Sequence, residues 1–244
     1  MSLQQIEIDL QVKGLLALPS RHVLRVESVI GSLVLSEVAN SGGTLDDADA
    51  ILNQIFAWHE VRNMRSAGGF WLTTSNTQTI VATVMNDRSA IEWSAAQIDV
   101  GADEIASLLY RHSALRKQGF NVKSSPGTEA ARSNRLRVLS GPSQLRGRLI
   151  GDAQVLAPWV RRIHNVGISG NRGFGEAAAQ MRVLGDVLPG DDLLLSDWPF
   201  LDPKGRRTLP VRAIDGEHGD INAGIAFPHR LQEQVSCLRA EVQL

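Results

Sequence analysis

A run of glycines late in the chain has the composition of a phosphate-binding loop. The segment Asn165-Val-Gly-Ile-Ser-Gly-Asn-Arg-Gly-Phe-Gly-Glu176 holds four glycines, with an arginine and a phenylalanine among them. Glycine reaches positive φ and has no Cβ, so backbone N–H groups in such a run can come close to a bound anion. We expect the anion to be held by Gly170, Asn171, Arg172, Gly173, Phe174 and Gly175.

Two common nucleotide-binding patterns differ from this run. A dinucleotide fingerprint places G-x-G-x-x-G after a strand, whereas Gly170, Gly173 and Gly175 have the reverse spacing and follow a predicted helix. The lysine and Ser/Thr of a P-loop are also absent. Two alternatives stay open: a structural turn with no ligand, and a mononucleotide bound at a helix N-terminus if residues 176–184 are helical. Propensity favours a helix there, while the apolar pattern allows a strand.

Charge is unevenly distributed along the 244 residues, although the formal net charge is only −1. Between residues 111 and 148 there are nine Lys or Arg and one acid, Glu129. Such a block indicates a polyanion site, with a solvated charged face as the alternative. Residues 119–141 lack periodicity, which is typical of a functional loop or protruding hairpin. The candidate phosphate contacts are Arg116, Lys117, Lys123, Arg132, Arg135 and Arg137.

Hydrophobic periodicity predicts the elements that position these two segments. Apolar and polar residues alternate near the N-terminus, which indicates a strand, and later stripes at helical spacing indicate packed helices. Thr44 and Asp47 form a capping-box pattern. The elements are, in order, a strand over 6–12, helices over 24–39 and 44–56, strands over 69–75 and 79–85 paired as a hairpin, a helix over 103–118, a strand over 145–151 and a helix capped by Asp152.

This order is close to βαββαβ with an elaboration in the middle, which predicts an α+β protein of ferredoxin-like or RRM-like layout. In that layout helices cover one face of a sheet and the other face is a natural platform for nucleic acid. The sequence lacks the aromatic motifs with which RRM sheets stack bases. RNA binding would therefore rest on charge and backbone contacts.

Composition argues against several classes of protein. At 43% hydrophobic residues, with no apolar run of about 18 residues and no basic-then-apolar N-terminus, the chain is expected to be soluble and cytoplasmic. Cys237 is the only cysteine, and His59-Glu60 has no second histidine at zincin spacing. We expect no metal and no cofactor. Arg62 and Arg65 are interpreted as solvated surface residues.

Several motifs resemble the CRISPR-associated RAMP superfamily. The strongest is Arg172-Gly-Phe-Gly175, placed after a helix. Downstream, Ser196-Asp-Trp198, then Arg207-Thr-Leu-Pro-Val211 and a segment over 224–228, resemble the fifth-numbered Cas family of type IV effector complexes. Upstream, the small residues of 124–132 and the aromatic run over 68–75 are similar to segments of that family.

The resemblance implies a RAMP ferredoxin-like domain over 1–188, with a thumb-like basic insertion at about 119–141 and the glycine-rich loop at 167–175. A C-terminal extension over 189–244 would complete the same domain or form an interface. It also implies a non-catalytic RNA-binding subunit of a CRISPR effector ribonucleoprotein in antiviral defence. This subunit would cap the 5′ handle of the crRNA and contact a backbone RAMP subunit and a large subunit, and a contact with target DNA beside the protospacer-adjacent motif stays open.

Two enzyme readings are kept beside it. One is the related RAMP endoribonuclease that processes precursor crRNA without a metal, for which His164, just ahead of the glycines, would be the base. The other is a mononucleotide-binding enzyme that uses the glycine loop.

Overall fold

The computed structural model of the chain describes residues 2–19, 23–73, 78–84, 91–94, 134–140, 142–167, 175–188, 190–225 and 234–242, and gives the backbone alone for residues 17, 19, 78–84, 91–94 and 134–140. The fold is α+β, with antiparallel sheets and few helices, as predicted. The helix predicted over 103–118 lies outside the described residues.

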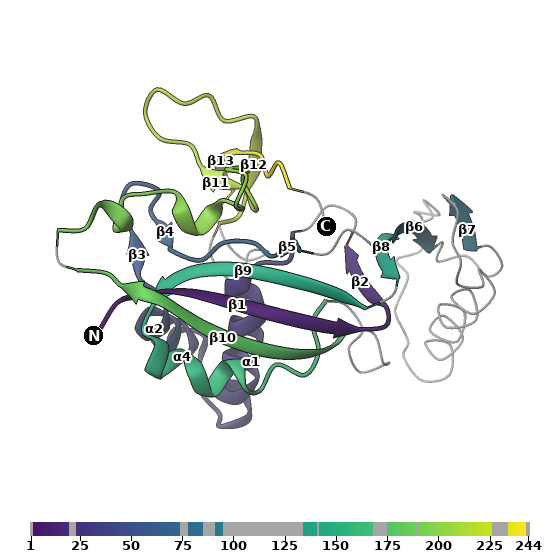
Figure 1. Cartoon of the computed structure of the whole chain (residues 1–244), viewed down its shortest axis with the longest axis horizontal. Helices are drawn as coiled ribbons and strands as arrows, with labels where there is room; N and C mark the ends of the chain where they lie inside the picture. Colours follow the sequence, from purple (N-terminus) through teal and green to yellow (C-terminus); the bar gives the residue numbers. More distant parts are fainter. Residues whose placement is uncertain are drawn as a thin grey trace.

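A four-stranded antiparallel sheet lies at the centre of the molecule, with its strands in the order β10-β1-β9-β5 (Figure 1). Ile6, Ile8 and Leu10 are fully buried, which confirms the strand predicted from alternation. The ambiguous segment 176–184 is part of a strand, in antiparallel register with β1. The bounds are Gln4–Lys13 for β1, Trp71–Leu72 for β5, Ser143–Gly151 for β9 and Glu176–Asp186 for β10.

Three helices cover one face of this sheet (Figure 1). The predicted capping box is present, because the Thr44 side chain accepts from the Asp47 N–H and the Asp47 carboxylate accepts from the Thr44 N–H at 2.7 Å. The Asp152 carboxylate caps the last helix by accepting from the N–H groups of Gln154 and Val155. Caps of this kind stabilise a helix by about 1 kcal/mol each. The bounds are Val26–Asn40 for α1, Leu45–Ile55 for α2 and Ala153–Val160 for α4.

A second antiparallel sheet has the order β2-β8-β6-β7. It shows that the hairpin predicted from residues 69–75 and 79–85 is wrong, because β5 pairs with β9 while β6 pairs with β7 and β8. Both runs have strand composition, but composition does not choose a strand's partner, which long-range packing decides. The bounds are Leu16–Pro19 for β2, Gln78–Val84 for β6, Ile91–Ser94 for β7 and Asn134–Ser140 for β8.

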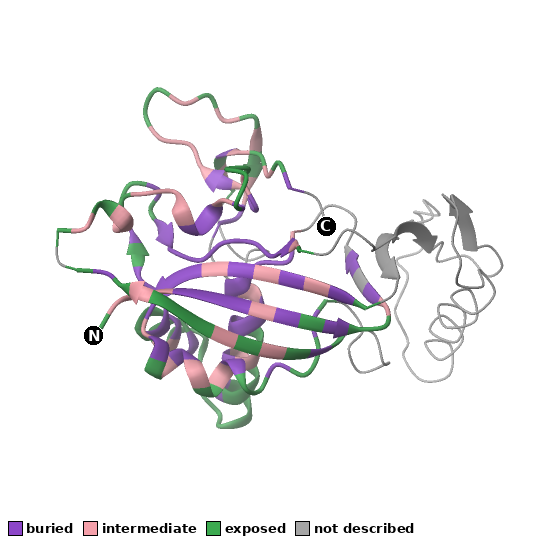
Figure 2. Ribbon diagram, viewed as in Figure 1, coloured by how far each residue is buried: buried purple, intermediate pink, exposed green. Residues whose placement is uncertain are grey.

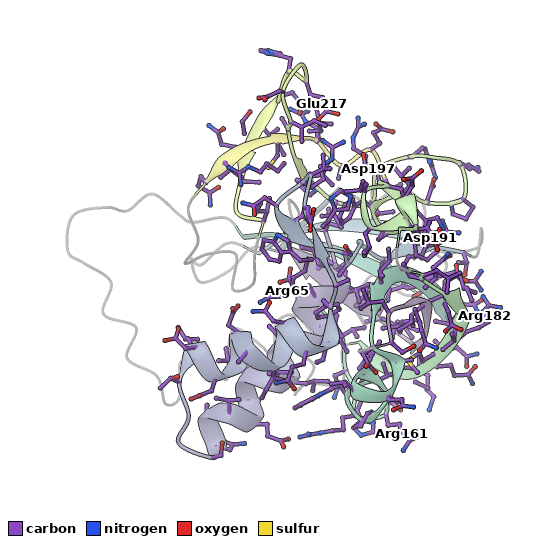
Figure 3. The ribbon with its side chains drawn as sticks, turned by 90° about the vertical axis from the view of Figure 1, so that its left-hand side faces the viewer. Arg65, Arg161, Arg182, Asp191, Asp197 and Glu217 are labelled. Carbon is purple, nitrogen blue, oxygen red and sulfur yellow. The ribbon has the colours of Figure 1, made fainter. Side chains whose placement is uncertain are left out.

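The C-terminal region lies on the other side of the central sheet from the helices (Figures 1 and 3). It has its own small core, in which Phe200, Val211 and Cys237 are fully buried. A Cβ on Gly68 would lie 1.9 Å from the Pro199 carbonyl oxygen, so the two backbones meet in close contact. The elements are η2 (Asp192–Leu194), η3 (Trp198–Phe200), β11 (Val211–Arg212), β12 (Ile221–Ala223) and β13 (Val235–Leu238).

Arg62 joins this region to the short hairpin of β3 (Trp58–His59) and β4 (Met64–Arg65). The interpretation of Arg62 as a solvated surface residue is therefore wrong. The guanidinium donates to both carboxylate oxygens of Asp197, at 2.9 and 2.6 Å, and to Glu217. Asp197 and Glu217 come from the C-terminal region (Figure 3). These carboxylates, Asp197 above all, raise the pKa of Arg62 above its usual range.

Arg65 is buried as well, which makes the solvated interpretation wrong for both arginines. Its guanidinium donates to Glu27 of α1 at 2.6 Å and to Asp49 and Asn53 of α2. The two helices are thereby tied to the β3–β4 hairpin. The prediction failed because most arginines are solvated, and because the partners of Arg65 lie 38 and 16 residues away in the sequence, where no local pattern reveals them.

Candidate nucleic-acid interface

The two ends of the glycine-rich segment are fastened together at one end of the central sheet. Asn165 and Glu176 form an antiparallel bridge. On either side of it, the Val166 N–H donates to the Gly175 carbonyl at 2.9 Å and the Ala177 N–H donates to the His164 carbonyl at 2.9 Å. The described residues on the two sides of this segment, 164–167 and 175–177, are therefore adjacent in the fold.

Gly175 is required by this closure. Its φ is +67°, and a Cβ at this position would lie 1.9 Å from the Val166 carbonyl oxygen. Any other residue would be strained by its backbone conformation and would also collide with the opposite strand. Gly175 is thus the predicted site residue whose position the structure explains most directly.

The stem of the basic insertion lies beside the same closure. The Gly175 N–H donates to the Leu15 carbonyl at 2.7 Å, and the next residue, Leu16, is paired with Leu139 of β8. Arg137 of β8 is in register with Leu18 of β2. The backbone therefore brings the basic strand and the glycine run, about thirty residues apart in sequence, to one end of the sheet.

Other predicted contacts are only partly placed. Arg135 and Arg137 are both in β8, in register with Thr83 and Val81 of β6. The remaining predicted residues lie outside the described residues, and their roles stay predictions: Arg116, Lys117, Lys123, Arg132, Gly170, Asn171, Arg172, Gly173 and Phe174.

A shallow hollow of about 320 Å³ lies next to the anchored ends of the loop. Its charged and titratable lining residues are Lys13, Arg161, His164 and Glu176. Lys13 forms an exposed ion pair with Glu176, with Nζ and Oε1 3.2 Å apart. Arg161 follows α4 and His164 precedes the bridge, and among the described residues neither side chain has a hydrogen bond or ion pair. The hollow therefore offers uncommitted cationic character beside the loop.

Arg161 was not among the predicted contacts, because a cation at a helix C-terminus complements the helix dipole without any ligand. Among the arginines whose side chains the structure describes, only Arg161 and Arg212 form no side-chain hydrogen bond or ion pair. Its neighbour Arg162, by contrast, pairs with Glu37 and lies over the Trp159 ring at 5.0 Å. The hydrogen bonds and ion pairs of the structure thus show that Arg161 is unpaired, which its position in the sequence does not reveal.

The helix-free face of the central sheet carries a ladder of ion pairs instead of a base-stacking platform. Glu7 lies between Arg148 and Arg182, at 3.3 and 2.8 Å, and Asp9 accepts from Arg146 at 2.6 Å. These cations are already neutralised by carboxylates on the neighbouring strand.

The aromatic side chains near this ladder are also occupied. The Arg148 guanidinium lies 5.3 Å from the centroid of Trp71 and 5.0 Å from that of Trp198. Trp71 is buried, so its ring offers no free face for a base. The sequence lacks base-stacking motifs. On this face of the sheet, the charged side chains and the described tryptophans instead interact with one another.

Two acidic residues near the start of α2, Asp47 and Asp49, have structural roles. Hydrogen bonds from Thr44 hold the pKa of Asp47 below its usual range, and Asp49 pairs with Arg65. In the part of the chain that the structure describes, no three His, Cys, Asp or Glu side chains group so as to hold a metal ion. Likewise, none of the described helices has the length and apolar character needed to cross a membrane.

Comparison with known proteins adds no assignment: no family model matches the chain, and no curated protein matches it significantly. The functional argument therefore rests on the geometry described above.

Proposed function

We propose that the protein is a non-catalytic RNA-binding subunit of a CRISPR effector ribonucleoprotein of type IV character, which caps the 5′ handle of the crRNA. The observation that carries the proposal is the meeting of the glycine-rich segment and the basic strand at one end of the sheet, through Gly175, Leu15 and Leu16. A glycine-rich segment whose described end adjoins a strand from a block of nine cations suits a polyanion better than a small ligand.

The fold supports this proposal through its connectivity. The chain runs through β1, the helices α1 and α2, β5, β9, α4 and β10, and the resulting sheet order is β10-β1-β9-β5 with the helices on one face. We interpret this as the ferredoxin-like core of a RAMP protein. The β2-β8-β6-β7 sheet would then be the base of the thumb-like insertion, and residues 189–244 the C-terminal extension.

In this proposal the RNA contacts are to phosphates. Backbone N–H groups of residues 170–174 and the Arg172 guanidinium would hold the handle, with Arg132, Arg135 and Arg137 extending the track, while the Gly175 N–H is already bonded to the Leu15 carbonyl and serves the closure of the loop. Arg161 and Lys13 would add to the positive field at the closure. The handle would be bound at the loop, while the backbone and large subunits of the effector would contact other surfaces of the protein.

The test is binding of repeat-derived single-stranded RNA, measured by fluorescence anisotropy over a range of salt concentrations. Arg132→Glu with Arg135→Glu should weaken binding at least tenfold and lower the logarithmic salt slope by about 1.4, at about 0.7 for each phosphate contact. Lys204→Glu with Arg239→Glu, in the exposed C-terminal region, is the charge-matched control. Unchanged affinity and slope in the first variant would refute the placement of the RNA.

Specificity needs a separate comparison. A scrambled RNA of equal length should bind more weakly than the repeat-derived RNA if the protein recognises a handle. Equal binding of the two would reduce the proposal to non-specific RNA binding.

One observation favours the endoribonuclease as a second candidate, namely that His164 lines the hollow together with Lys13 and Arg161. Metal-independent cleavage requires a base for the 2′-hydroxyl and a cation for the developing charge, and His164 and the unpaired Arg161 would supply these two groups. A discrete product from labelled repeat RNA in the presence of a chelator, lost in His164→Ala, would support that activity. Intact RNA in both proteins supports the non-catalytic subunit.

Among the described residues, the structure does not contain the helix on which the mononucleotide-binding alternative depended. It required residues 176–184 to begin a helix, and this segment is part of the strand β10. The glycine run therefore does not lead into a helix N-terminus.

A further inference from the structure

The strand β10 forms an edge of the central sheet, and much of its length is coloured as exposed (Figures 1 and 2). It is eleven residues long, and Val183 and Leu184 are 43% and 44% exposed. Among the described strands it pairs only with β1. A long edge strand with exposed apolar residues is a template for another strand, and proteins usually protect such edges with charges, proline or a covering segment.

The unpaired part of this edge has defined ends. At its start, residues 164–166 cover the outer side of β10, because the Ala177 N–H donates to the His164 carbonyl. At its far end the register with β1 shifts, since Val183 is opposite Ile6 but Gly185 is opposite Gln5, which leaves Leu184 as a bulge. The regular part of this edge that no described segment covers is therefore residues 178–183.

The direction of the backbone groups along this edge follows from the same hydrogen bond. Because the Ala177 N–H points away from β1, the N–H and C=O groups of alternate residues do so as well. Ala179, Met181 and Val183 thus have outward backbone groups. An added antiparallel strand can form hydrogen bonds only in registers that place outward-pointing residues opposite each other.

We infer that the edge of β10 binds the same edge of a second copy of the chain, antiparallel and about a two-fold axis at Met181. In this register Met181 is opposite its own copy, Ala179 is opposite Val183, and Gln180 is opposite Arg182. The two central sheets would join into one continuous sheet. Such an isologous contact is the commonest form of homodimer.

Neighbouring registers fit less well. A centre at Arg182 would place two arginines opposite each other, which is destabilising. A centre at Gln180 would leave Val183 opposite Ala177, whose outer side is already covered by residue 164. The register centred at Met181 uses most of the regular edge, covers Val183 with Ala179 and opposes no like charges. A second copy is therefore an occupant that this sequence itself matches.

Disulfide trapping tests the register directly. In a Cys237→Ala background, Met181→Cys places two thiols opposite each other at a Cα separation of about 5.5 Å, within the range of a disulfide. Mild oxidation should give a covalent dimer. Leu184→Cys is the matched control, since the two copies of residue 184 would be six residues apart in register, or about 20 Å, and should not cross-link.

Association in solution gives an independent readout. Sedimentation velocity of the full chain over a wide concentration range should show a dimer that Val183→Lys and Met181→Pro convert to monomer. The Met181 N–H points outward, so proline there removes no hydrogen bond to β1, and circular dichroism should report an unchanged fold. A monomer at every concentration, or a dimer that survives both substitutions while Met181→Cys fails to cross-link, would overturn the inference.

Discussion

The backbone N–H of Gly175 donates to the carbonyl oxygen of Leu15 across 2.7 Å, so the glycine-rich segment is hydrogen-bonded to the turn between β1 and β2. Leu15 is followed directly by the strand that pairs with β8 of the basic insertion. A change at this hydrogen bond should consequently affect the geometry of the loop and of the insertion together.

Replacing Gly175 should show whether its contact with Val166 matters beyond the strain that positive φ imposes on any residue other than glycine. Gly175→Ala should lower the free energy of unfolding by more than the roughly 1–3 kcal/mol expected for a strained backbone, and should also weaken RNA binding, because the added Cβ collides with Val166. Gly190→Ala is the control, since Gly190 has φ +88° but open space around it. Equal losses of stability in the two variants would contradict a role for the collision.

The unpaired cation in the hollow gives a second prediction. Arg161→Ala should weaken RNA binding several-fold and reduce the salt slope by about 0.7, the value for one phosphate contact. Arg162→Ala is its matched neighbour, because Arg162 is already engaged with Glu37 and Trp159. If both variants bind RNA like the original protein, the hollow is not part of the RNA surface.

Loss of the Arg62 guanidinium should be among the most destabilising changes. Arg62→Met would leave Asp197 and Glu217 without their partner, at a cost of about 3 kcal/mol, the lower end for a buried pair because both carboxylates keep about 30% exposure. Urea denaturation would measure it. Arg239→Met, which removes an exposed pair with Asp220, should change the free energy of unfolding by at most about 1 kcal/mol.

His59 should make stability depend on pH. Its Nδ1 accepts from the Arg62 N–H at 3.1 Å and its Nε2–H donates to the Ser196 carbonyl, an arrangement of the neutral ring. Burial lowers the pKa of His59 and outweighs Asp197, which is 3.9 Å away and favours the charged form.

The folded state therefore binds fewer protons than the unfolded state below the ordinary histidine pKa of about 6.5. The contribution of neutral His59 to the free energy of unfolding should be fully present above this pH. It should fall as the pH decreases through it, by at most about 1.4 kcal/mol per pH unit. Urea titrations between neutral and mildly acidic pH should show this slope, and His59→Gln should flatten it. A slope unchanged in the variant would assign the dependence to other groups, such as Glu217.

Local signals in the sequence predicted much of the central fold. The alternation that contains Ile6 and Ile8, the capping box at Thr44 and the cap at Asp152 each depend on neighbouring residues, and each was confirmed. The sequence did not reveal which residues far apart along the chain contact one another. The pairing of β5 with β9 and the burial of Arg62 against Asp197, 135 residues away, depend on tertiary contacts that no local pattern records.

The candidate site divides in the same way. The glycine run and the basic block were visible as composition, but their meeting at Leu15 required the fold. Arg161 was passed over because its place after a helix has a sufficient electrostatic explanation. Its lack of a partner, shared among the described arginines only with Arg212, and its place in the hollow appear only in the structure. The strand character of residues 176–184 was undecided by propensity and is determined by pairing with β1.

The burial of Arg62 and Arg65 has a consequence for handling the protein. Dissolved ions screen exposed charges far more than buried ones, so these internal networks should change little as ionic strength rises, whereas the proposed contacts with RNA phosphates should weaken steeply. A concentrated salt wash should accordingly remove copurified nucleic acid and leave the chain folded. The ratio of absorbance at 260 and 280 nm would then fall while circular dichroism reports an unchanged fold.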